Sequence, residues 1–244
     1  MINGSVTMTW RGVRLVLLPD RAMLLPDVAT LIVADVHLGK PASFRASGVP
    51  VPEGVTARDL GRLSGLIATT EAKRLIILGD LIHDGVAFEE RTSKAVRDWR
   101  YSLSSVEVDL VPGNHDRKAS SFESLGVREI ATHAALEVAG YRLELTHEPV
   151  REPRVPTLCG HVHPAVSVGA RRSVSRVRSS CFWFDGDLGI LPAFGSFTGG
   201  KSMGLRDGIA AFAAGERGVI PVTEAARQFE ETAGDQEAHA YDLG

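Results

Sequence analysis

Residues 31–37 read LIVADVH, and residues 75–84 read LIILGDLIHD. Each stretch begins with a short run of aliphatic residues and ends in Asp and His, which is typical of a buried strand that leads into a polar loop. Apolar side chains recur at helical spacing in residues 56–72 and 88–103, and a third apolar run follows at 106–111. Two successive strand–helix–strand units predict an α/β fold with parallel strands, whose functional groups gather beyond the carboxyl ends of the strands.

The overall composition excludes several classes of protein. The chain has 244 residues, 44% of them hydrophobic, which is enough for a buried core. Two cysteines are too few for a disulfide framework or a Cys-rich zinc module, and they fit a reducing compartment. No apolar run is long enough to span a bilayer and no signal-peptide pattern is present, so we expect a cytoplasmic protein with no membrane association.

Charge is distributed unevenly along the chain. The formal net charge is -3, which by itself indicates neither a nucleic-acid partner nor a strongly acidic surface. Residues 223–244 hold six acids and one base, so we expect an acidic, flexible tail there after a single domain at residues 1–222. That domain carries 26 bases and 24 acids, a formal charge of +2, which permits a nucleic-acid substrate.

Side chains that bind metals follow the apolar runs, in the blocks DVH (35–37), GDLIHD (79–84), GNHD (113–116), TH (146–147) and GHVH (160–163). In an extended chain, residues two apart point to the same side, so each Asp-x-His or His-x-His pair is expected to face one site. Carboxylate, amide and imidazole ligands without thiolate suit Mn²⁺, Fe or Zn²⁺. The candidate ligands are Asp35, His37, Asp80, Asn114, His147, His161 and His163.

This number of ligands exceeds what one ion can use, so the residues predict two divalent ions. A carboxylate shared between two cations stays ionised, and the pair can activate a water for in-line attack on a phosphoester. Taken singly, each candidate could be a capping or satisfied polar residue at a strand end, but the ordered set favours a metal centre. His133 and His239 belong to none of the blocks, and we expect them to be ordinary surface residues.

The five blocks, in this order, resemble the calcineurin-like metallophosphoesterase superfamily, whose pattern is D-x-H, G-D, G-N-H-D/E, H and G-H-x-H. The resemblance implies a four-layer α/β/β/α sandwich of two mixed sheets flanked by helices. It also implies that His115 lies by the scissile phosphate and donates to the leaving oxygen or to a non-bridging oxygen. The implied ligands are Asp35, His37 and His163 for one ion and Asn114, His147 and His161 for the other, with Asp80 bridging.

The second block departs from the phosphatases of this superfamily, which read G-D-x-x-D-R. Here His83 and Asp84 stand where those enzymes have an Asp that orients the active histidine and an Arg that grips phosphate. His83 is therefore a candidate for contact with the substrate phosphate or with a metal-bound water. Which group orients His115 stays open between Asp116, Asp84 and the backbone.

Longer stretches resemble the bacterial ligase-associated DNA damage response endonucleases: ADVHLGKPASFRASG (34–48), HEP (147–149), GHVHP (160–164) and PAFGSFTGG (192–200). This resemblance implies a Mn²⁺-dependent endonuclease of single-stranded DNA in DNA repair. It implies functional association with an ATP-dependent DNA ligase, an exonuclease of the metallo-β-lactamase class and a helicase. The residues alone imply only a phosphoester, so hydrolysis of a nucleotide or other small phosphoester and a non-catalytic docking role in a repair complex remain alternatives.

Residues 195–202, GSFTGGKS, match the P-loop pattern of nucleotide-binding proteins. A P-loop needs a helix directly after it, and two glycines within residues 203–208 disfavour one, so we expect a tight loop at the rim of the site instead of an ATP site. Aromatic and basic residues near the blocks are candidates for contact with DNA. These candidates are Phe44, Arg45, Arg117, Arg171, Arg172 and Lys201.

Overall fold

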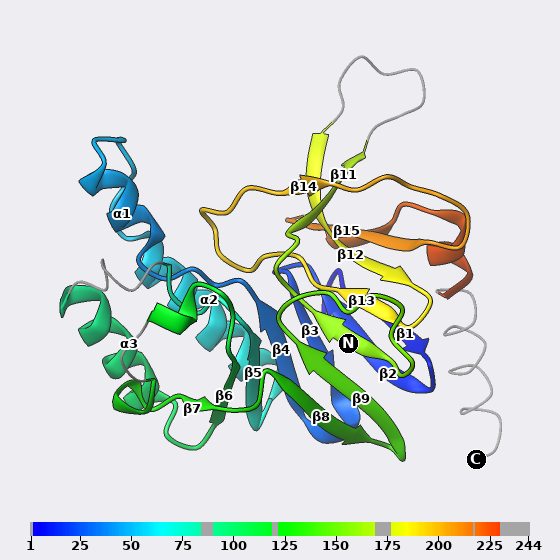
Figure 1. Cartoon of the computed structure of the whole chain (residues 1–244), viewed down its shortest axis with the longest axis horizontal. Helices are drawn as coiled ribbons and strands as arrows, with labels where there is room; N and C mark the ends of the chain where they lie inside the picture. Colours follow the sequence, from blue (N-terminus) through cyan, green and yellow to red (C-terminus); the bar gives the residue numbers. More distant parts are fainter. Residues whose placement is uncertain (1, 84–89, 119–121, 169–176, 217, 230–244) are drawn as a thin grey trace.

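The computed structural model of the chain describes residues 2–83, 90–118, 122–168, 177–216 and 218–229. Two β-sheets pack face to face, and helices cover the outer face of one of them (Figure 1). Both sheets contain parallel and antiparallel pairs of strands, which confirms the predicted α/β fold with two mixed sheets.

The first sheet has the order β1-β2-β3-β4-β5-β6-β7. Strands β1 to β4 are antiparallel neighbours, whereas β4 to β7 run parallel, as the two predicted strand–helix–strand units require. The strands are β1 Val6–Trp10, β2 Val13–Leu18, β3 Ala22–Leu25, β4 Thr30–Ala34, β5 Arg74–Leu78, β6 Glu107–Val111 and β7 Arg128–Glu129.

The second sheet has the order β14-β11-β12-β13-β10-β9-β8, with β15 beside β12 and β16 beside β15. Strand β10 is parallel to both β9 and β13, while the hairpin β8–β9 and the pair β11–β12 are antiparallel. The strands are β8 His133–Val138, β9 Tyr141–Thr146, β10 Thr157–Cys159, β11 Pro164–Val168, β12 Val177–Asp185, β13 Leu188–Ile190, β14 Lys201–Ser202, β15 Ala210–Gly215 and β16 Gly218–Pro221.

The helices among the described residues are α1 Lys40–Ala46, α2 Val55–Thr70, α3 Glu90–Ser102 and the short 3₁₀ helices η1 Pro26–Val28, η2 Asp116–Lys118 and η3 Glu123–Leu125, with a further helical segment at residues 224–229. Helix α2 follows Gly54, which has a φ of 82°, and it buries the apolar face that the sequence predicts, including Leu60 and Leu63. Both α2 and α3 pack on the first sheet. None of the described helices is long and apolar enough to cross a membrane.

Alternate side chains of β4 serve two different layers, which explains why its sequence is apolar without interruption. Leu31 and Val33 pack among the helices, while Ile32 and Ala34 pack in the core between the two sheets. The second sheet contributes large side chains such as Phe182 to this inter-sheet core. Each fully buried side chain of this size contributes about 1.5–3 kcal/mol to the stability of the fold.

The outer face of the second sheet carries a third apolar cluster, which includes Val166 and Trp183. Met203 and Ile209, from the segment between β14 and β15, pack against this cluster. In the described part of the chain, this segment covers the face on which the resemblance implied a second helical layer.

Packing continues beyond residue 222, where the sequence suggested the start of a flexible tail. Residues 224–229 are helical, and Ala226 is fully buried in the inter-sheet core, with Phe229 packed against the same core. The first residues of the expected tail therefore belong to the folded body, because their apolar side chains find a place between the sheets. Residues 230–244 lie outside the described residues.

We predict that Leu63→Ala lowers the free energy of unfolding by about 2–5 kcal/mol, because it leaves a cavity in the cluster between α2 and the first sheet. Leu205→Ala removes the same atoms from a side chain that is 49% exposed, and it should change stability by less than about 0.5 kcal/mol. Chemical denaturation of both variants measures the difference. Equal losses would contradict the packing described for α2.

Candidate metal centre

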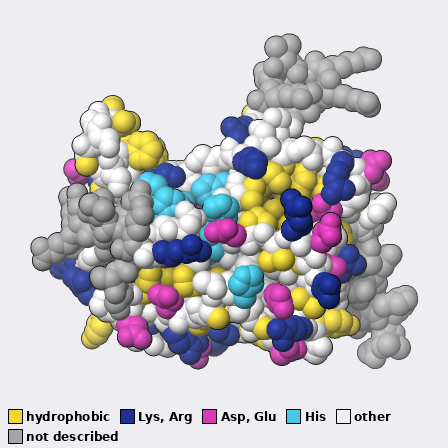
Figure 2. All heavy atoms as spheres, viewed as in Figure 1, with side chains coloured by type: hydrophobic (Ala, Val, Ile, Leu, Met, Phe, Trp, Pro, Cys, Tyr) yellow, Lys and Arg dark blue, Asp and Glu magenta, His cyan; other side chains and the backbone are white. Residues whose placement is uncertain are grey.

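The predicted metal-binding blocks meet at one edge of the molecule, at the carboxyl ends of strands from both sheets. Loops after β4, β5 and β6 come from the first sheet, and loops after β9 and β10 come from the second. Their histidines gather in the hollow between the projecting α1 and the hairpin β11–β12 (Figure 2). The structure brings together all seven candidate ligands, together with His83 and His115.

One group of potential ligands consists of Asp35, His37 and His163, whose ligand atoms lie within 4.8 Å of one another. The Nε2 atoms of His37 and His163 are 3.3 Å apart. Nε2 of His163 is also 3.3 Å from Oδ1 of Asp35. These are the three residues that the resemblance implies for one ion.

A second group consists of Asp80, His147 and His161. Nε2 of His147 lies 3.1 Å from Nδ1 of His161 and 3.1 Å from Oδ1 of Asn114. Asp80 stands between the two groups, because its Oδ1 is 3.6 Å from Nε2 of His147 and its Oδ2 is 3.9 Å from Nε2 of His37. Asp80 is therefore within reach of both groups.

The chemistry of these side chains fits divalent cations. Oδ1 of Asp35 is buried and has no hydrogen-bond partner, which is costly for a carboxylate oxygen unless a cation lies beside it. Burial, and then the nearby charge of Lys40, lowers the pKa of His37 to about 2, so its imidazole is neutral and able to ligate. Nδ1 of His147 lies 3.0 Å from the Leu78 carbonyl oxygen, a contact that leaves Nε2 facing the site.

Five of the candidate ligands have left-handed backbones, with φ values of 54° at Asp35, 52° at His37, 51° at Asp80, 67° at His161 and 52° at His163. Such a conformation costs a non-glycine residue about 1–2 kcal/mol. The expectation that an extended chain aligns these pairs is therefore wrong. The side chains converge because the loops turn sharply and are held by backbone bonds between them, such as His37 N–H to the Asp80 carbonyl at 2.8 Å.

The glycine that precedes three of the ligands is required by close packing. A Cβ atom on Gly79 would lie 2.0 Å from Nδ1 of His147, and one on Gly113 would lie 2.2 Å from Oδ1 of Asp80. At Gly160 the distance to Oδ2 of Asp35 would be 2.7 Å. The glycines of the blocks G-D, G-N-H-D and G-H-x-H therefore let one loop approach the ligands of another.

Comparison with known proteins agrees with this geometry. Residues 29–165 match the model of the calcineurin-like phosphoesterase family. The chain belongs to this family. Pseudomonas putida nuclease MPE has a crystal structure that is 35% identical, with a TM-score of 0.75 over 89% of this chain and 100% of that chain. Yfce, a phosphoesterase from E. coli, is 17% identical, with a TM-score of 0.42 over 78% of this chain and 96% of that chain. A search of curated proteins finds no match.

Family membership makes the protein a hydrolase of phosphoester bonds that uses divalent metal ions. In this phosphoesterase, the ring of His115 stacks on that of His83 with centroids 4.8 Å apart and an angle of 30°. The His115 side chain is 26% exposed, and its Nε2 lies 3.9 Å from Oδ2 of Asp80. His115 therefore faces both the carboxylate between the two ligand groups and the open hollow.

Both carboxylate oxygens of Asp116 accept backbone N–H groups, from Gly113 at 2.8 Å and from Ile82 at 3.3 Å. The structure thus gives Asp116 a positioning role, because it ties the loop that carries His115 to the loop that carries Asp80. Burial raises the pKa of Asp116 to about 6. Asp84, the other side chain considered for orienting His115, lies outside the described residues.

The residues considered for contact with DNA lie in different parts of this phosphoesterase, and not all of them are near the metal centre. The backbone N–H of Lys201 donates to the His163 carbonyl at 2.8 Å, so its exposed side chain stands at the rim of the metal centre. Phe44 packs edge-on against Phe197 with centroids 5.3 Å apart. Arg117 is exposed and lines a cavity of about 170 Å³ beside His147. Arg171 and Arg172 lie outside the described residues.

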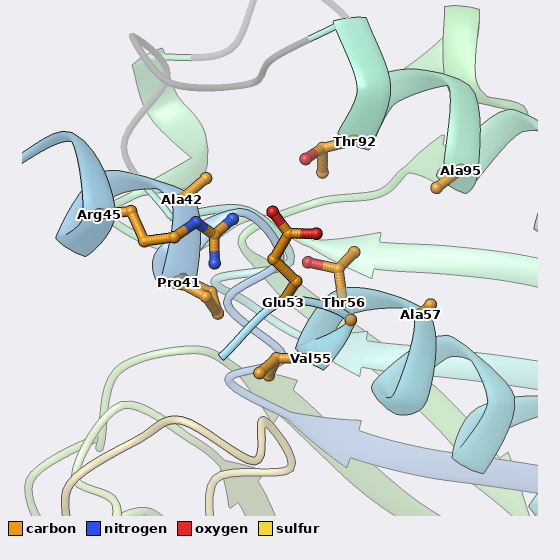
Figure 3. Close-up of a pocket in the computed structure, with 10 residues that line it drawn as sticks. Pro41, Ala42, Arg45, Glu53, Val55, Thr56, Ala57, Thr92 and Ala95 are labelled. Atoms are coloured by element: carbon orange, nitrogen blue, oxygen red, sulfur yellow. The ribbon is translucent and has the colours of Figure 1, made fainter. Parts of the chain in front are cut away.

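Arg45 is turned away from the metal centre. Its Nη1 donates to the carbonyl oxygens of Val51 at 3.4 Å and Pro52 at 3.3 Å. Figure 3 shows it in a pocket between α1, α2 and α3, on the side where Glu53 also points. This geometry assigns Arg45 to holding the segment between α1 and α2, and it offers no support for contact with substrate at the metals.

The P-loop match at residues 195–202 does not form a nucleotide site. Lys201 and Ser202 form strand β14 instead of starting a helix, and no helix directly follows them in the described chain. The N–H of Gly195 donates to the Asp35 carbonyl at 3.1 Å. The segment is the rim loop that the sequence predicts.

Sequence reasoning missed two residues of α2 that support this rim loop. Asp59 of α2 is buried, and its carboxylate accepts the Ser196 N–H at 3.0 Å and Nη1 of Arg62 at 3.0 Å. Arg62 also donates to the Phe194 carbonyl at 3.0 Å. The available signal was a lone acid next to Leu60 on the apolar face of α2, which is an unusual position unless the carboxylate is paired.

We predict that Gly79→Ala lowers metal affinity at least about tenfold, because the new methyl group displaces His147 and breaks its contact with Leu78. Gly140→Ala is the matched control, since Gly140 has a φ of 85° but nothing within 4 Å of its Cβ position. Both variants share the backbone strain, so calorimetric titration with Mn²⁺ isolates the clash. Equal affinities in the two variants would contradict the packing around Gly79.

The pH dependence of the metal-free protein provides another prediction. Because the pKa of His37 is about 2 in the folded state, the unfolded state takes up its proton first below pH 6.5, and folding stability is lost as pH falls. Between pH 7 and pH 5 this contribution amounts to about 2 kcal/mol. Asp116, with its raised pKa, contributes stability that increases as pH falls, which opposes the effect of His37. The contribution of His37 is therefore obtained by subtracting the pH dependence of unfolding free energy in His37→Asn from that in wild type.

Urea denaturation in the presence of a chelator measures this difference at both pH values. The control His133→Asn, at an exposed position, should keep the wild-type dependence on pH. A wild-type dependence in His37→Asn would show that His37 is not held neutral by burial.

Proposed function

We propose that this phosphoesterase is a Mn²⁺-dependent endonuclease that hydrolyses single-stranded DNA in DNA repair. The observation that carries the proposal is the openness of the metal centre. Among its potential ligands, Asn114 and His161 are exposed, and the histidines lie in an open hollow of the surface (Figure 2). An open site admits a continuous strand, whereas a small phosphoester is usually held in an enclosed pocket.

The similarity to Pseudomonas putida nuclease MPE, at 35% identity over nearly the whole chain, supports a phosphodiester of nucleic acid as substrate. Functional association with an ATP-dependent DNA ligase, an exonuclease of the metallo-β-lactamase class and a helicase belongs to the same proposal. Carboxylate, amide and imidazole atoms without thiolate suit Mn²⁺, Fe or Zn²⁺, and we choose Mn²⁺ because it is the metal that the resemblance to the ligase-associated endonucleases implies.

In the proposed centre, Asp35, His37 and His163 would hold one ion and Asn114, His147 and His161 the other, with Asp80 available to both. When bound, such a pair of cations supplies a nucleophile at neutral pH and neutralises charge on the phosphoryl oxygens. The side chains of the protein bind and orient the substrate and donate a proton to the leaving oxygen.

His115 is the residue placed for the leaving oxygen. Its imidazole is partly exposed and stacked on His83, which fixes the plane of the ring. A proton on Nε2 could be donated to the departing ribose oxygen or to a non-bridging phosphoryl oxygen. His83 and Asp116 are positioning residues in this proposal, because one packs on the ring and the other fixes the loop.

Cationic side chains stand on two sides of the centre. Arg117 lines the cavity beside His147. On the other side, the backbone N–H of Lys201 donates to the His163 carbonyl. Phosphates on either side of the scissile bond would meet these charges, which supply affinity without sequence preference. This arrangement supports a polymeric substrate that passes over the metal ions.

Incubation with circular single-stranded DNA and Mn²⁺ tests the proposed function, because a circle has no ends and only an endonuclease can open it. We expect linear products with wild type, loss of at least about 1,000-fold in rate with Asp80→Ala, and none with chelator. Asp98→Ala, which removes an exposed acid on α3, should keep the wild-type rate.

Parallel reactions with a small aryl phosphodiester and with Zn²⁺ define the alternatives. Hydrolysis of the small ester without cleavage of DNA under either metal would overturn the nuclease and favour a small phosphoester substrate. Failure to hydrolyse both substrates, in protein that binds Mn²⁺, would favour the non-catalytic docking role.

A further inference from the structure

Another polar cavity, of about 460 Å³, opens beside the rim loop, residues 195–202, of which Ser196 lines it. Its lining includes Arg21, Arg62, Arg178, Ser180 and Ser196. We propose that this cavity binds a backbone phosphate of the nucleic-acid strand at a distance from the bond that is cut. The inference rests on the proposed function, since it adds a subsite for the same strand.

Arg21 is the central residue of the cavity. It lies in the turn between β2 and β3 with a φ of 65°, a left-handed conformation that favours glycine or asparagine. Among the described residues it makes one side-chain hydrogen bond, from Nη1 to the Gly195 carbonyl at 3.4 Å, although a guanidinium carries five donors.

Arg21 is partly buried, with a second arginine and two acids as its charged neighbours. Burial, followed by the positive charge of Arg62, lowers the pKa of Arg21 to about 10. Arg62 is itself occupied, because it binds the carboxylates of Asp20 and Asp59. Asp20 and Asp59 together balance the charges of Arg62 and Arg21, so a phosphate at Arg21 would be held through the guanidinium donors that are not bonded to described residues.

Arg178, on strand β12, supplies a second available cation. Its side chain is exposed and makes no ion pair with an acid in the described part of the chain. Glu216 stands at the cavity as the remaining acid, and it too is exposed. Two guanidinium groups beside a serine hydroxyl are the donors that bind phosphate oxygens in a planar, bidentate manner.

The rim loop connects this cavity to the metal centre. At one end, Gly195 donates to the backbone of Asp35, and at the other, Lys201 donates to the backbone of His163. Gly200 lies between His163 and Arg178. A Cβ atom placed on Gly200 would be 3.3 Å from the His163 carbonyl oxygen and 4.0 Å from Nη2 of Arg178. A strand that leaves the metals past His163 would reach Arg178 and then Arg21.

Binding of a fluorescein-labelled oligothymidylate in the presence of chelator tests the proposal, because cleavage is then blocked. We expect Arg21→Gln and Arg178→Gln each to raise Kd about tenfold. Each should also reduce the slope of log K against log salt by about 0.7, the value for one phosphate contact with a single strand. Arg142→Gln is the matched control, since Arg142 is an exposed arginine on β9 outside the cavity, and it should change neither quantity.

Thermal melting of each variant checks that it is folded. If one of the two variants does not fold, the other still tests the proposal. Oligonucleotide binding in both cavity variants equal to that of Arg142→Gln would overturn the proposal. The melts are repeated with inorganic phosphate. If phosphate raises the melting temperature of wild type but not of the cavity variants, while oligonucleotide binding is unchanged, the cavity holds free phosphate only and the proposal is overturned. Cleavage of circular DNA by wild type separates these results from a failure of the proposed function, in which wild type neither binds nor cuts DNA.

Discussion

The metal centre depends on the contact between the two sheets, because each sheet carries part of the ligand set. Asp35, His37, Asp80 and Asn114 follow strands of the first sheet, while His147, His161 and His163 follow strands of the second. Several polar contacts join the halves at the site, and two of them involve backbone groups. One is between Nδ1 of His147 and the Leu78 carbonyl at 3.0 Å, and the other runs from His161 N–H to Oδ2 of Asp35 at 2.8 Å. The apolar core behind them keeps these distances fixed.

This dependence explains why strained backbone is tolerated at so many ligands. The left-handed residues bring carboxylates and imidazoles within 4.8 Å of one another, where like polar groups repel in the absence of a cation. The inter-sheet core supplies the stability that offsets the strain. Because two packed sheets hold the loops that carry the ligands, the stability of the sheets contributes to metal affinity.

Particular residues show how far the sequence predicted this arrangement. The apolar runs at 31–35 and 75–80 predicted two strands of one sheet, and the polar residues at their ends predicted where the site lies. The backbone at Asp35 could not be predicted, because its left-handed turn is set by a bond to the Gly79 carbonyl, which is remote in sequence. Asp116 lies in a recognisable block, yet its role as an acceptor for Ile82 follows only from the packing of two loops. Arg21 carries no pattern at all, because a single arginine in a turn is usually a surface residue.

The rim loop relates the metal centre to the choice of substrate. A small phosphoester bound at the metals can contact the ligands and His115, but it cannot extend past His163 to Arg178 and Arg21. A strand reaches both regions, and contacts far from the scissile bond can then help to align that bond with the metals. The loop is held on α2 by Asp59 and Arg62, so its two faces keep a fixed relation to each other. Under the proposed function, the preference for a polymer thus follows from the rigid connection between the two regions, and it requires no cap over the metals from the described residues.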